Sequence, residues 1–452
     1  MAQSDPRDLM IAELLRRIAA LEAELARLKQ NSSNSSRPPS TDPPGSPRRS
    51  PEPTGRPRGG QPGHKQHKRE LLPPEQVTRV VELRPQRCEE CRHPLAGTDP
   101  APLRSQSIEL PRVKPLVTEY RQHQLGCDRC GTLTRSALPA GVSVFGPRLS
   151  AAIAVCSGKY RLSKRVTQEL LSDFLGIDLA LGSICKLERR VSEALATPVE
   201  EARAFIRRQD MVHLDETGWR EDKQRAWLWT AASELVTVFI VSSGRGAAVA
   251  KQIVGEDFSG FIVSDRWPGY DWAECRQLCW AHLLRDFQGF VDRGGDGAVC
   301  GGALLDQSAL MFRWWHRVRD GTLTRGTFRR RMRKLERRVE RLLRRVSFCG
   351  DKTTSAKAFE IYKLRRFLWT FVDTEFVPPT NNAAERAIRP AVLWRKGSFG
   401  TDSAQGSRFV ERILSVVASL KQQGRHVLDY LAAACSPPHR RTISISLLPA
   451  GA

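Results

Sequence analysis

The sequence lacks any run of about 18 apolar residues free of charge, so no membrane-spanning helix is expected. Asp5, Asp8 and Glu13 lie where the apolar part of a secretory signal would begin. Without an export signal, 11 cysteines in 452 residues favour metal ligands or free thiols over a disulfide framework. These absences exclude a membrane protein and a small secreted module, and predict a cytoplasmic protein. The 40% share of hydrophobic residues excludes a fully disordered chain.

Acidic residues are scarce compared with basic ones. The 49 Asp and Glu against 72 Lys and Arg give a formal net charge of +23 and a pI near 10.1. Such an excess predicts a polyanionic partner, because neutralising phosphates releases counterions and drives binding to nucleic acid. The length leaves room for about three domains of ~150 residues.

Residues 1–30 carry a short heptad pattern of apolar residues. The repeating positions are Ile11, Ile18 and Leu25, and Leu14, Leu21 and Leu28. This pattern favours a parallel two-stranded coiled coil, in which Arg17 would face Glu22 and Glu24 would face Lys29 of a second copy. The alternative is one amphipathic helix that packs on its own chain. We therefore expect a homo-oligomer that needs further contacts, because so few heptads form only a weak dimer.

Residues 31–70 are rich in Ser, Pro, Gly and Arg, and are predicted to form a disordered basic linker. Arg56 and Arg58 lie between glycines in an extended segment that could enter a narrow DNA minor groove. The alternative is a linker that is cationic only for solubility.

Two Cys-x-x-Cys pairs follow, in a predicted zinc-binding module of residues 71–140. Cys88, Cys91, Cys127 and Cys130 have the spacing of four thiolates around a structural Zn²⁺, and the short β-like runs between them favour a zinc-ribbon-like hairpin. Such a metal would fold the module without taking part in chemistry. The alternative is chance pairs of free cysteines.

Residues 141–208 predict a helical DNA-binding region, with helices over 147–156, 163–174 and 182–196. The break at 176–182 is typical of a helix-turn-helix, which would place Lys186, Arg189 and Arg190 on the recognition helix. A plain helical spacer remains the alternative.

From residue 209 the periodicity changes to that of strands. Strands are predicted over 211–215, 227–231, 236–241 and 260–265, with a helix over 247–254 before the last strand. Three meandering strands, a crossover helix and a returning strand predict an α/β fold with an RNase-H-like mixed sheet. We expect this catalytic domain to cover residues 209–435, with a helical insertion at about 280–375 and a C-terminal tail over 436–452.

One predicted helix of the insertion, residues 325–345, holds eleven Lys or Arg and two Glu. Its apolar stripe is Met332, Leu335, Val339 and Leu342. The basic face is interpreted either as a solvated surface or as a phosphate-contacting one.

Three acidic residues are candidate catalytic groups. Asp215 and Asp265 each end an apolar β run, so both carboxylates would meet at one sheet edge if these strands are neighbours. Such oxygen ligands suit Mg²⁺ or Mn²⁺, and a third acid is needed to hold two ions ~4 Å apart. Glu385 is the best candidate, in a short helix capped by Thr380 or Asn381 and ended by Pro390.

Other roles for these acids remain open on spacing alone. An acid at a strand end is commonly a turn or cap residue, and Glu385 could pair with Arg389 four residues later.

The chain resembles DDE transposases of the insertion-sequence-66 family over nearly its whole length. The matching segments are His213 to Trp219 (HLDETGW), Val263 to Tyr270 (VSDRWPGY), Asn381 to Pro390 (NNAAERAIRP), Asn31 to Ser40, Gly59 to His64 and the paired cysteines. The resemblance implies that Asp215, Asp265 and Glu385 bind two Mg²⁺ ions, and that the helical block is an insertion into the catalytic fold. One departure is Asp265-Arg266-Trp267 where the family often has Asp-Gly-Tyr, and it concerns the loop after the second acid, not the carboxylate itself.

Several other polar residues lie near the three acids in the sequence, and a role is predicted for each. Cys279 and His282 resemble half a zinc site, but no second half is apparent, so a structural role or one beside the active site is favoured. Glu216 would point away from Asp215 and is not expected to bind metal. The basic residues around the third acid are candidate phosphate contacts: Arg386, Arg389, Arg395 and Lys396.

The resemblance implies a bacterial, nucleoid-associated transposase that binds terminal inverted repeats and target DNA, with accessory proteins of its element as further candidate partners. It would cleave the element's ends and join the 3′-hydroxyl to target DNA. The alternatives are a metal-dependent nuclease, which would cut without joining, and a non-catalytic DNA-binding regulator.

Overall fold

The computed structural model describes residues 70–441 and 443–449, together with scattered positions between 7 and 42. Most of the predicted linker, including Arg56 and Arg58, lies outside the described residues, as do Glu22, Glu24, Leu25 and Lys29 of the predicted coil. The described apolar heptad positions are all at least half exposed, from 50% at Ile18 to 70% at Leu28. Arg17 pairs with Glu13 of its own chain at 2.9 Å.

A five-stranded mixed sheet forms the centre of the fold, in the order β5-β4-β3-β6-β7. The strands are β3 (Met211–Glu221), β4 (Gln224–Ala232), β5 (Thr237–Ser242), β6 (Phe261–Ser264) and β7 (Arg276–Leu278). β3, β4 and β5 pair antiparallel, whereas β6 runs parallel to both β3 and β7. The sheet confirms the predicted mixed α/β class, and it places the first predicted strand beside the fourth, the condition on which the meeting of Asp215 and Asp265 depends.

Two helices position this sheet. The crossover α6 (Ala247–Val254) has the predicted bounds and joins β5 to β6. The edge strand β5 is covered by α13 (Ala404–Gln422), whose side chains accept its backbone N–H groups. The pairs are Thr237 N to Ser419 Oγ at 3.0 Å, Phe239 N to Ser415 Oγ at 2.9 Å, and Val241 N to Glu411 Oε1 at 2.6 Å. The edge is thereby closed to pairing with another strand.

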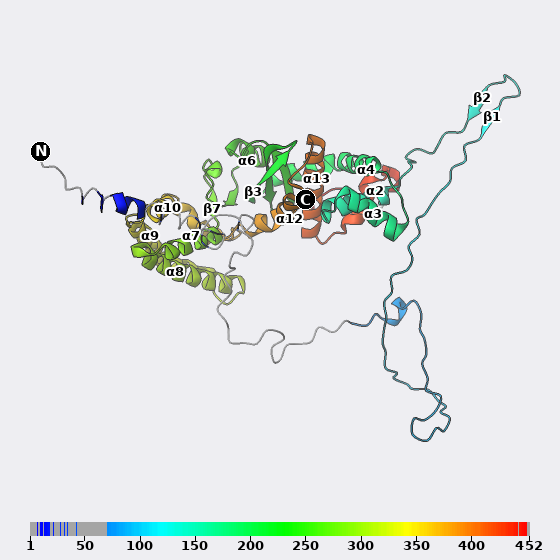
Figure 1. The fold of residues 1–452 in the computed structure, drawn as a ribbon, viewed down its shortest axis with the longest axis horizontal. Coiled ribbons are helices and arrows are strands. Elements are labelled where there is room, and N and C mark those ends of the chain that lie inside the picture. Colours follow the sequence, from blue (N-terminus) through cyan, green and yellow to red (C-terminus); the bar gives the residue numbers. More distant parts are fainter. Residues whose placement is uncertain are drawn as a thin grey trace.

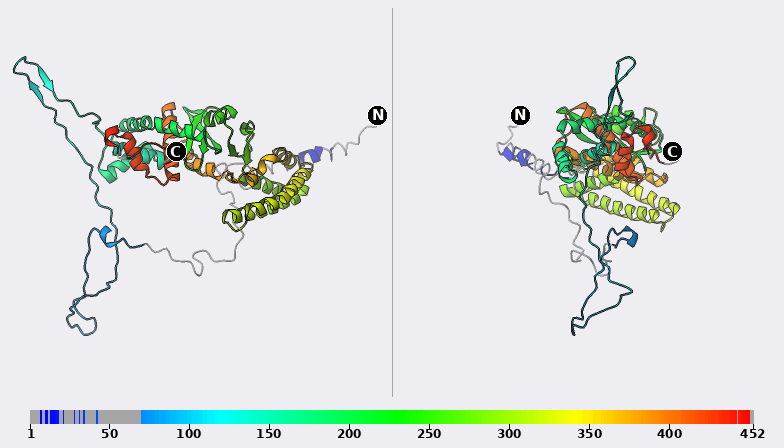
Figure 2. Two further views of the ribbon diagram at one scale, coloured as in Figure 1. Left: turned by 180° about the vertical axis from the view of Figure 1, so that it is seen from behind. Right: turned by 90° about the vertical axis from the view of Figure 1, so that its right-hand side faces the viewer.

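Helices flank the sheet on two sides (Figures 1 and 2). On one side lie α2 (Pro147–Ala154) with its π-helical continuation Val155–Lys159, α3 (Lys164–Leu175), α4 (Leu181–Ala194), α5 (Ala196–Ile206) and α14 (Val427–Cys435). On the other lie α7 (Trp280–Arg293), α8 (Gly295–Arg319), α9 (Arg325–Val346), α10 (Lys352–Lys363) and α11 (Thr370–Asp373), around a hydrophobic core of their own. α12 (Asn382–Ser398) then returns the chain to the sheet.

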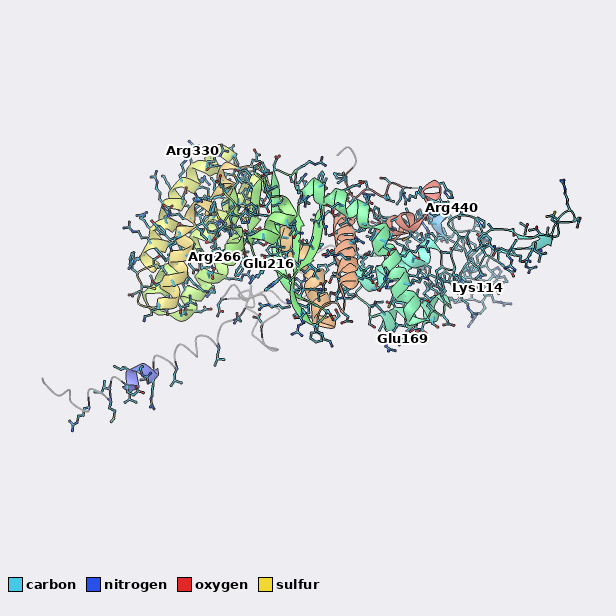
Figure 3. All side chains as sticks on the ribbon, turned by 90° about the horizontal axis from the view of Figure 1, so that it is seen from above. Lys114, Glu169, Glu216, Arg266, Arg330 and Arg440 are labelled. Atoms are coloured by element: carbon cyan, nitrogen blue, oxygen red, sulfur yellow. The ribbon has the colours of Figure 1, made fainter. Side chains whose placement is uncertain are left out.

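The apolar stripe of α9 agrees with the prediction except at one position. Met332, Leu335 and Val339 are buried, but Leu343 rather than Leu342 completes the stripe. At 3.6 residues per turn, Leu343 lies about three full turns after Met332 and so on the same face, which explains the one-residue difference. Arg330 lies at the outer surface of this helix, where Figure 3 shows it.

Residues 70–140 extend away from the sheet, and none of them is buried (Figure 1). They contain a 3₁₀ turn (Pro74–Gln76) and a small hairpin of β1 (Gln124–Gly126) and β2 (Leu133–Arg135). After α14 and a further 3₁₀ turn (Pro438–Arg440), the chain packs back on α13 and α14, where Leu447 is fully buried. None of the helices in the described part of the chain has the length and apolar character needed to cross a membrane.

Candidate functional site

The first two predicted acids lie on neighbouring parallel strands. The register pairs His213 of β3 with Val263 of β6, which brings Asp215 and Asp265, each two residues further on, to the same level. Asp215 Oδ1 accepts the backbone N–H of Glu216 at 2.9 Å, and Asp265 Oδ1 accepts that of Trp267 at 2.8 Å. These bonds fix one oxygen of each carboxylate and leave the other for a ligand.

The third predicted acid, Glu385, lies in the first turn of α12. Asn381 precedes this helix, and its side chain reaches β3 instead of capping the helix as predicted. Asn381 Nδ2 donates to Leu214 O at 2.7 Å, and Asn381 Oδ1 lies 3.0 Å from His213 Nδ1. Both contacts are to residues just before Asp215 in the chain, so Asn381 ties the helix that bears Glu385 to the strand that bears Asp215.

The prediction that Pro390 ends this helix is wrong, because α12 continues through Pro390 to Ser398. A proline inside a helix removes one hydrogen bond and strains the preceding turn. Here packing of α12 against β3 and β4 outweighs that local cost. Arg395 Nη1 adds a bond to Gly218 O of β3 at 2.9 Å, and Phe399 closes the helix in the left-handed conformation, with φ of 63°.

The acids influence one another electrostatically. Burial raises the pKa of Asp215 well above its usual value, and the negative charges of Glu216, Asp265 and Glu385 raise it further. Across the described residues, no Lys or Arg forms an ion pair with Asp215 or Asp265. A divalent cation between the acids would offset their mutual repulsion, and their carboxylate oxygens are ligands that Mg²⁺ and Mn²⁺ prefer.

Glu216 lies beside Asp215 in sequence, but its carboxylate is engaged elsewhere. Its side chain is 2% exposed, Oε1 pairs with Arg245 at 2.9 Å, and Oε2 accepts the hydroxyl of Tyr270. β3 continues past Glu216, and both carboxylate oxygens of Glu216 have protein partners.

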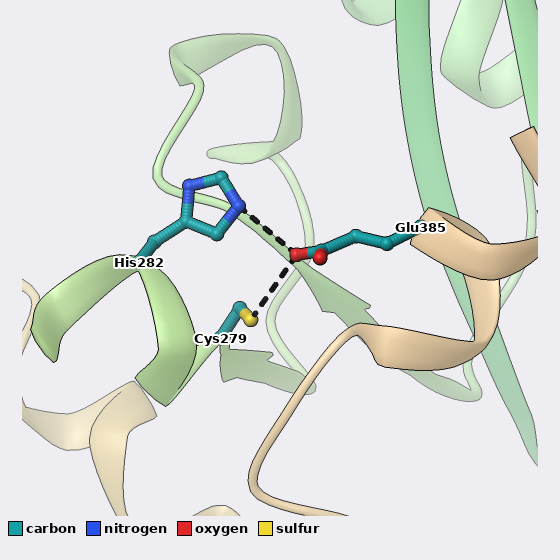
Figure 4. A group of neighbouring side chains, drawn as sticks. All are labelled: Cys279, His282 and Glu385. Carbon is teal, nitrogen blue, oxygen red and sulfur yellow. Dashed lines mark hydrogen bonds and ion pairs between the residues drawn. The ribbon is translucent and has the colours of Figure 1, made fainter. Parts of the chain in front are cut away.

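Cys279 and His282 lie beside Glu385 (Figure 4). His282 Nε2 is 3.1 Å from Glu385 Oε1, and Cys279 Sγ is 3.8 Å from the same oxygen. The His282 contact is the main reason that the pKa of Glu385 is lowered, whereas burial raises the pKa of the Cys279 thiol to about 12. The Glu385–Arg389 pair considered from spacing is not formed, because Glu385 pairs with His282 across the fold.

Two arginines shape the loop after Asp265. Arg266, the departure from the family motif, forms an ion pair with the fully buried Asp286 of α7. Figure 3 shows Arg266 on the side of the helical block and Glu216 by the strands. Arg276, whose side chain is fully buried, donates to Asp265 O at 2.7 Å and to Asp271 Oδ1 at 2.8 Å. The loop after Asp265 is therefore held in place although Arg266 departs from the family motif.

Sequence reasoning missed the positioning roles of Asn381, Arg276 and His213. Asn381 and His213 stand within the quoted motifs, so a search for polar residues around each acid would have selected them. Arg276 lies in a short strand between Cys275 and Gln277 and has no distinguishing sequence pattern.

The predicted DNA-binding residues fall into two groups. Lys186 and Arg189 on α4 are exposed, as are Arg386, Arg389 and Lys396 on α12. Arg190 instead donates to Ser143 Oγ at 2.9 Å, and Arg395 holds β3 as described above.

The four predicted zinc ligands form two separate turns. Arg92 N donates to Cys88 O at 3.1 Å, and Gly131 N donates to Cys127 O at 2.8 Å. The backbone N–H of Cys91 lowers the pKa of Cys88, and the Thr132 hydroxyl lowers that of Cys130. The two turns do not come together: among the described residues, the group close enough to share a metal is Cys279, His282 and Glu385.

Comparisons with known proteins identify the family. The sequence profile of a family of unknown function (DUF6444) matches residues 2–70. An uncharacterized protein, y4qI, of Sinorhizobium fredii (strain NBRC 101917 / NGR234) is 28% identical over 238 residues, and the match spans 46% of this chain and 43% of that relative. The profile of the transposase IS66 family matches residues 142–408, which is more than half of the chain and includes all three predicted acids. The chain therefore belongs to the transposase IS66 family.

Proposed function

We propose that this protein is a DDE-type DNA transposase, which binds the terminal inverted repeats of its element, cleaves the ends and joins them to target DNA. The observation that carries the proposal is the pairing of β3 with β6, which places Asp215 and Asp265 side by side. Glu385 lies close enough to raise the pKa of Asp215. An RNase-H-like core is supported by the sheet order, with three antiparallel strands followed by two parallel ones.

Asp215, Asp265 and Glu385 would hold two Mg²⁺ or Mn²⁺ ions. The mutual repulsion of these acids and their oxygen donors fit that cofactor. When bound, such a pair supplies a polarised nucleophile and charge stabilisation at the phosphate. Asn381 keeps the helix of Glu385 against β3, and Arg276 supports the loop of Asp265. His282 favours the ionised form of Glu385.

The proposed reaction has two phosphoryl-transfer steps. A water oxygen attacks the phosphorus at the element's end in line, and the 3′-oxygen leaves and takes up a proton. That 3′-hydroxyl then attacks a phosphorus of target DNA and displaces its 3′-oxygen, without a covalent protein–DNA intermediate. Arg386, Arg389 and Lys396, exposed on the helix of Glu385, would contact the backbone phosphates.

The remaining regions would recognise the ends and assemble the complex. A structural Zn²⁺ held by Cys88, Cys91, Cys127 and Cys130 would join two turns that no buried core holds together. α3 and α4 would act as a helix-turn-helix, with Lys186 and Arg189 toward DNA. The exposed heptad residues support a homo-oligomer formed through a coiled coil, and accessory proteins of the element are further candidate partners.

Strand transfer with purified protein tests this function. The reaction contains Mg²⁺, a labelled duplex that carries the element's end, and a plasmid target. We expect labelled end joined to plasmid, with a free 3′-hydroxyl end as the precursor. Cleavage without joining would replace the proposal with a nuclease, and specific end binding without either product would favour a regulator.

The raised pKa of Asp215 predicts that the free energy of unfolding of the wild-type protein depends on pH. Because the folded state binds this proton more tightly than the unfolded chain, stability falls as pH rises above the unfolded pKa of about 3.9. In chelator at neutral pH, Asp215→Asn should therefore be more stable than wild type, and the difference should vanish at acid pH. Mg²⁺ at about 100 times its Kd should stabilise wild type by about 2.7 kcal/mol and the variant by less.

Urea denaturation with and without Mg²⁺ measures both effects. Asp210→Asn is the matched control, since this exposed acid lies just before β3. Equal responses of all three proteins to Mg²⁺ would contradict a cation site at Asp215.

A further inference from the structure

Three potential metal ligands of different chemistry converge at the start of α7 and the start of α12 (Figure 4). Cys279 precedes α7, His282 lies in the first turn of α7, and Glu385 lies in the first turn of α12. One ligand atom from each lies within 4.8 Å of the other two. The two residues that sequence reasoning treated as half a site thus meet a third donor 103 residues away.

The spacing of these donors suits a tetrahedral ion. With Zn–S bonds of about 2.3 Å and Zn–N and Zn–O bonds of about 2.0–2.2 Å, tetrahedral ligand atoms lie roughly 3.6 Å apart. The observed separations from Glu385 Oε1 are 3.1 Å to His282 Nε2 and 3.8 Å to Cys279 Sγ. Small adjustments of side chains would therefore place all three around one ion.

The donor set also selects the kind of metal. Thiolate and imidazole favour Zn²⁺ and related transition ions, whereas Mg²⁺ favours oxygen and octahedral geometry. Backbone N–H groups already point at the sulfur: Asn381 N donates to Cys279 Sγ at 3.1 Å, and those of Ala281 and His282 also interact with it. Such donors support a thiolate at the start of a helix.

We propose that Cys279, His282 and Glu385 form a transition-metal site that binds Zn²⁺, with its fourth position open to water or DNA. This site is distinct from the four-cysteine zinc module and from the Mg²⁺ site, with which it shares Glu385. A Zn²⁺ ion here would engage the carboxylate that the acidic pair needs. If the proposed function is correct, Zn²⁺ therefore competes with Mg²⁺-dependent strand transfer.

Metal binding by the full-length protein tests the site without reference to activity. Purified apoprotein is titrated with Co²⁺ and then with Zn²⁺, and bound metal is counted after gel filtration. We expect Cys279→Ser and His282→Gln each to bind one equivalent less per chain, or to bind it at least about tenfold more weakly. The single-thiolate cobalt absorption of the wild-type site should disappear in Cys279→Ser. Cys275→Ser, a nearby exposed cysteine outside the cluster, should match wild type.

Equal stoichiometry and affinity in wild type, Cys279→Ser and His282→Gln would overturn the site. His282→Gln keeps the test valid if the buried Cys279→Ser variant folds poorly, because His282 is partly exposed. The four-cysteine module contributes equally to all of these proteins, so it cancels in the comparison. If wild type binds more metal than Cys279→Ser and His282→Gln but gives no strand transfer, the proposed function is refuted and the metal site stands.

Discussion

Replacing Glu385 with Gln should reduce strand cleavage and strand transfer by about 10³-fold, which corresponds to about 4 kcal/mol of lost transition-state stabilisation. Gln has nearly the same shape, and its amide can still contact His282, so α12 should keep its place. The change removes one negative charge from a site whose acids act on one another. The proposed cation pair would then lose a ligand.

The measurement compares product formation with end binding in a mobility-shift assay. End binding should stay within about twofold of wild type, because the residues of α12 that are proposed to contact phosphates are unchanged. Glu375→Gln, an exposed acid ahead of α12, is the matched control and should retain activity. An equal loss of binding and cleavage in Glu385→Gln would mean that Glu385 supports DNA binding or folding rather than chemistry.

Replacing Arg276 with Met should lower the free energy of unfolding by about 3 kcal/mol. The fully buried Arg276 side chain donates to Ser264 Oγ, Asp271 Oδ1 and the backbone oxygens of Asp265 and Trp267. Met fills a similar volume but leaves these acceptors without their donor. The loop that carries Asp265 should therefore lose its support, and strand transfer should fall with it.

Urea denaturation and strand transfer should be measured together on this variant. Arg276→Lys keeps the charge but cannot reproduce the planar fork of donors, so it should recover only part of the stability. Arg225→Met removes an exposed arginine from β4 and should change stability little. Wild-type stability and activity in Arg276→Met would show that the loop is held without this side chain.

Local sequence patterns predicted most of the elements around the site. Alternating or continuous apolar runs identified β3, β4, β5 and β6, and helical periodicity gave the bounds of α6. Burial of apolar side chains determines these elements, and that signal is local. The strand ends were less well predicted: β3 continues for six residues past Asp215, because pairing with β4 extends to Glu221 and Gln224.

The same local reasoning failed where tertiary contacts outweighed propensity. Pro390 is a helix breaker by itself, yet α12 is held through it by packing and by Arg395 on Gly218. Asparagine is a residue type that commonly caps helices, but the side-chain amide of Asn381 instead joins α12 to β3. In both cases the competing interaction comes from a strand more than 150 residues earlier in the chain.

By itself the sequence determined the excess of basic charge, the strand and helix identities, the three candidate acids and the family resemblance, because each depends on composition or short-range pattern. Only the tertiary structure decided that β3 pairs with β6, that Glu385 faces His282 and Cys279, and that Arg276 supports the Asp265 loop. These contacts join residues that are far apart in the chain. The packing that brings them together cannot be recognised from the local periodicity of either segment.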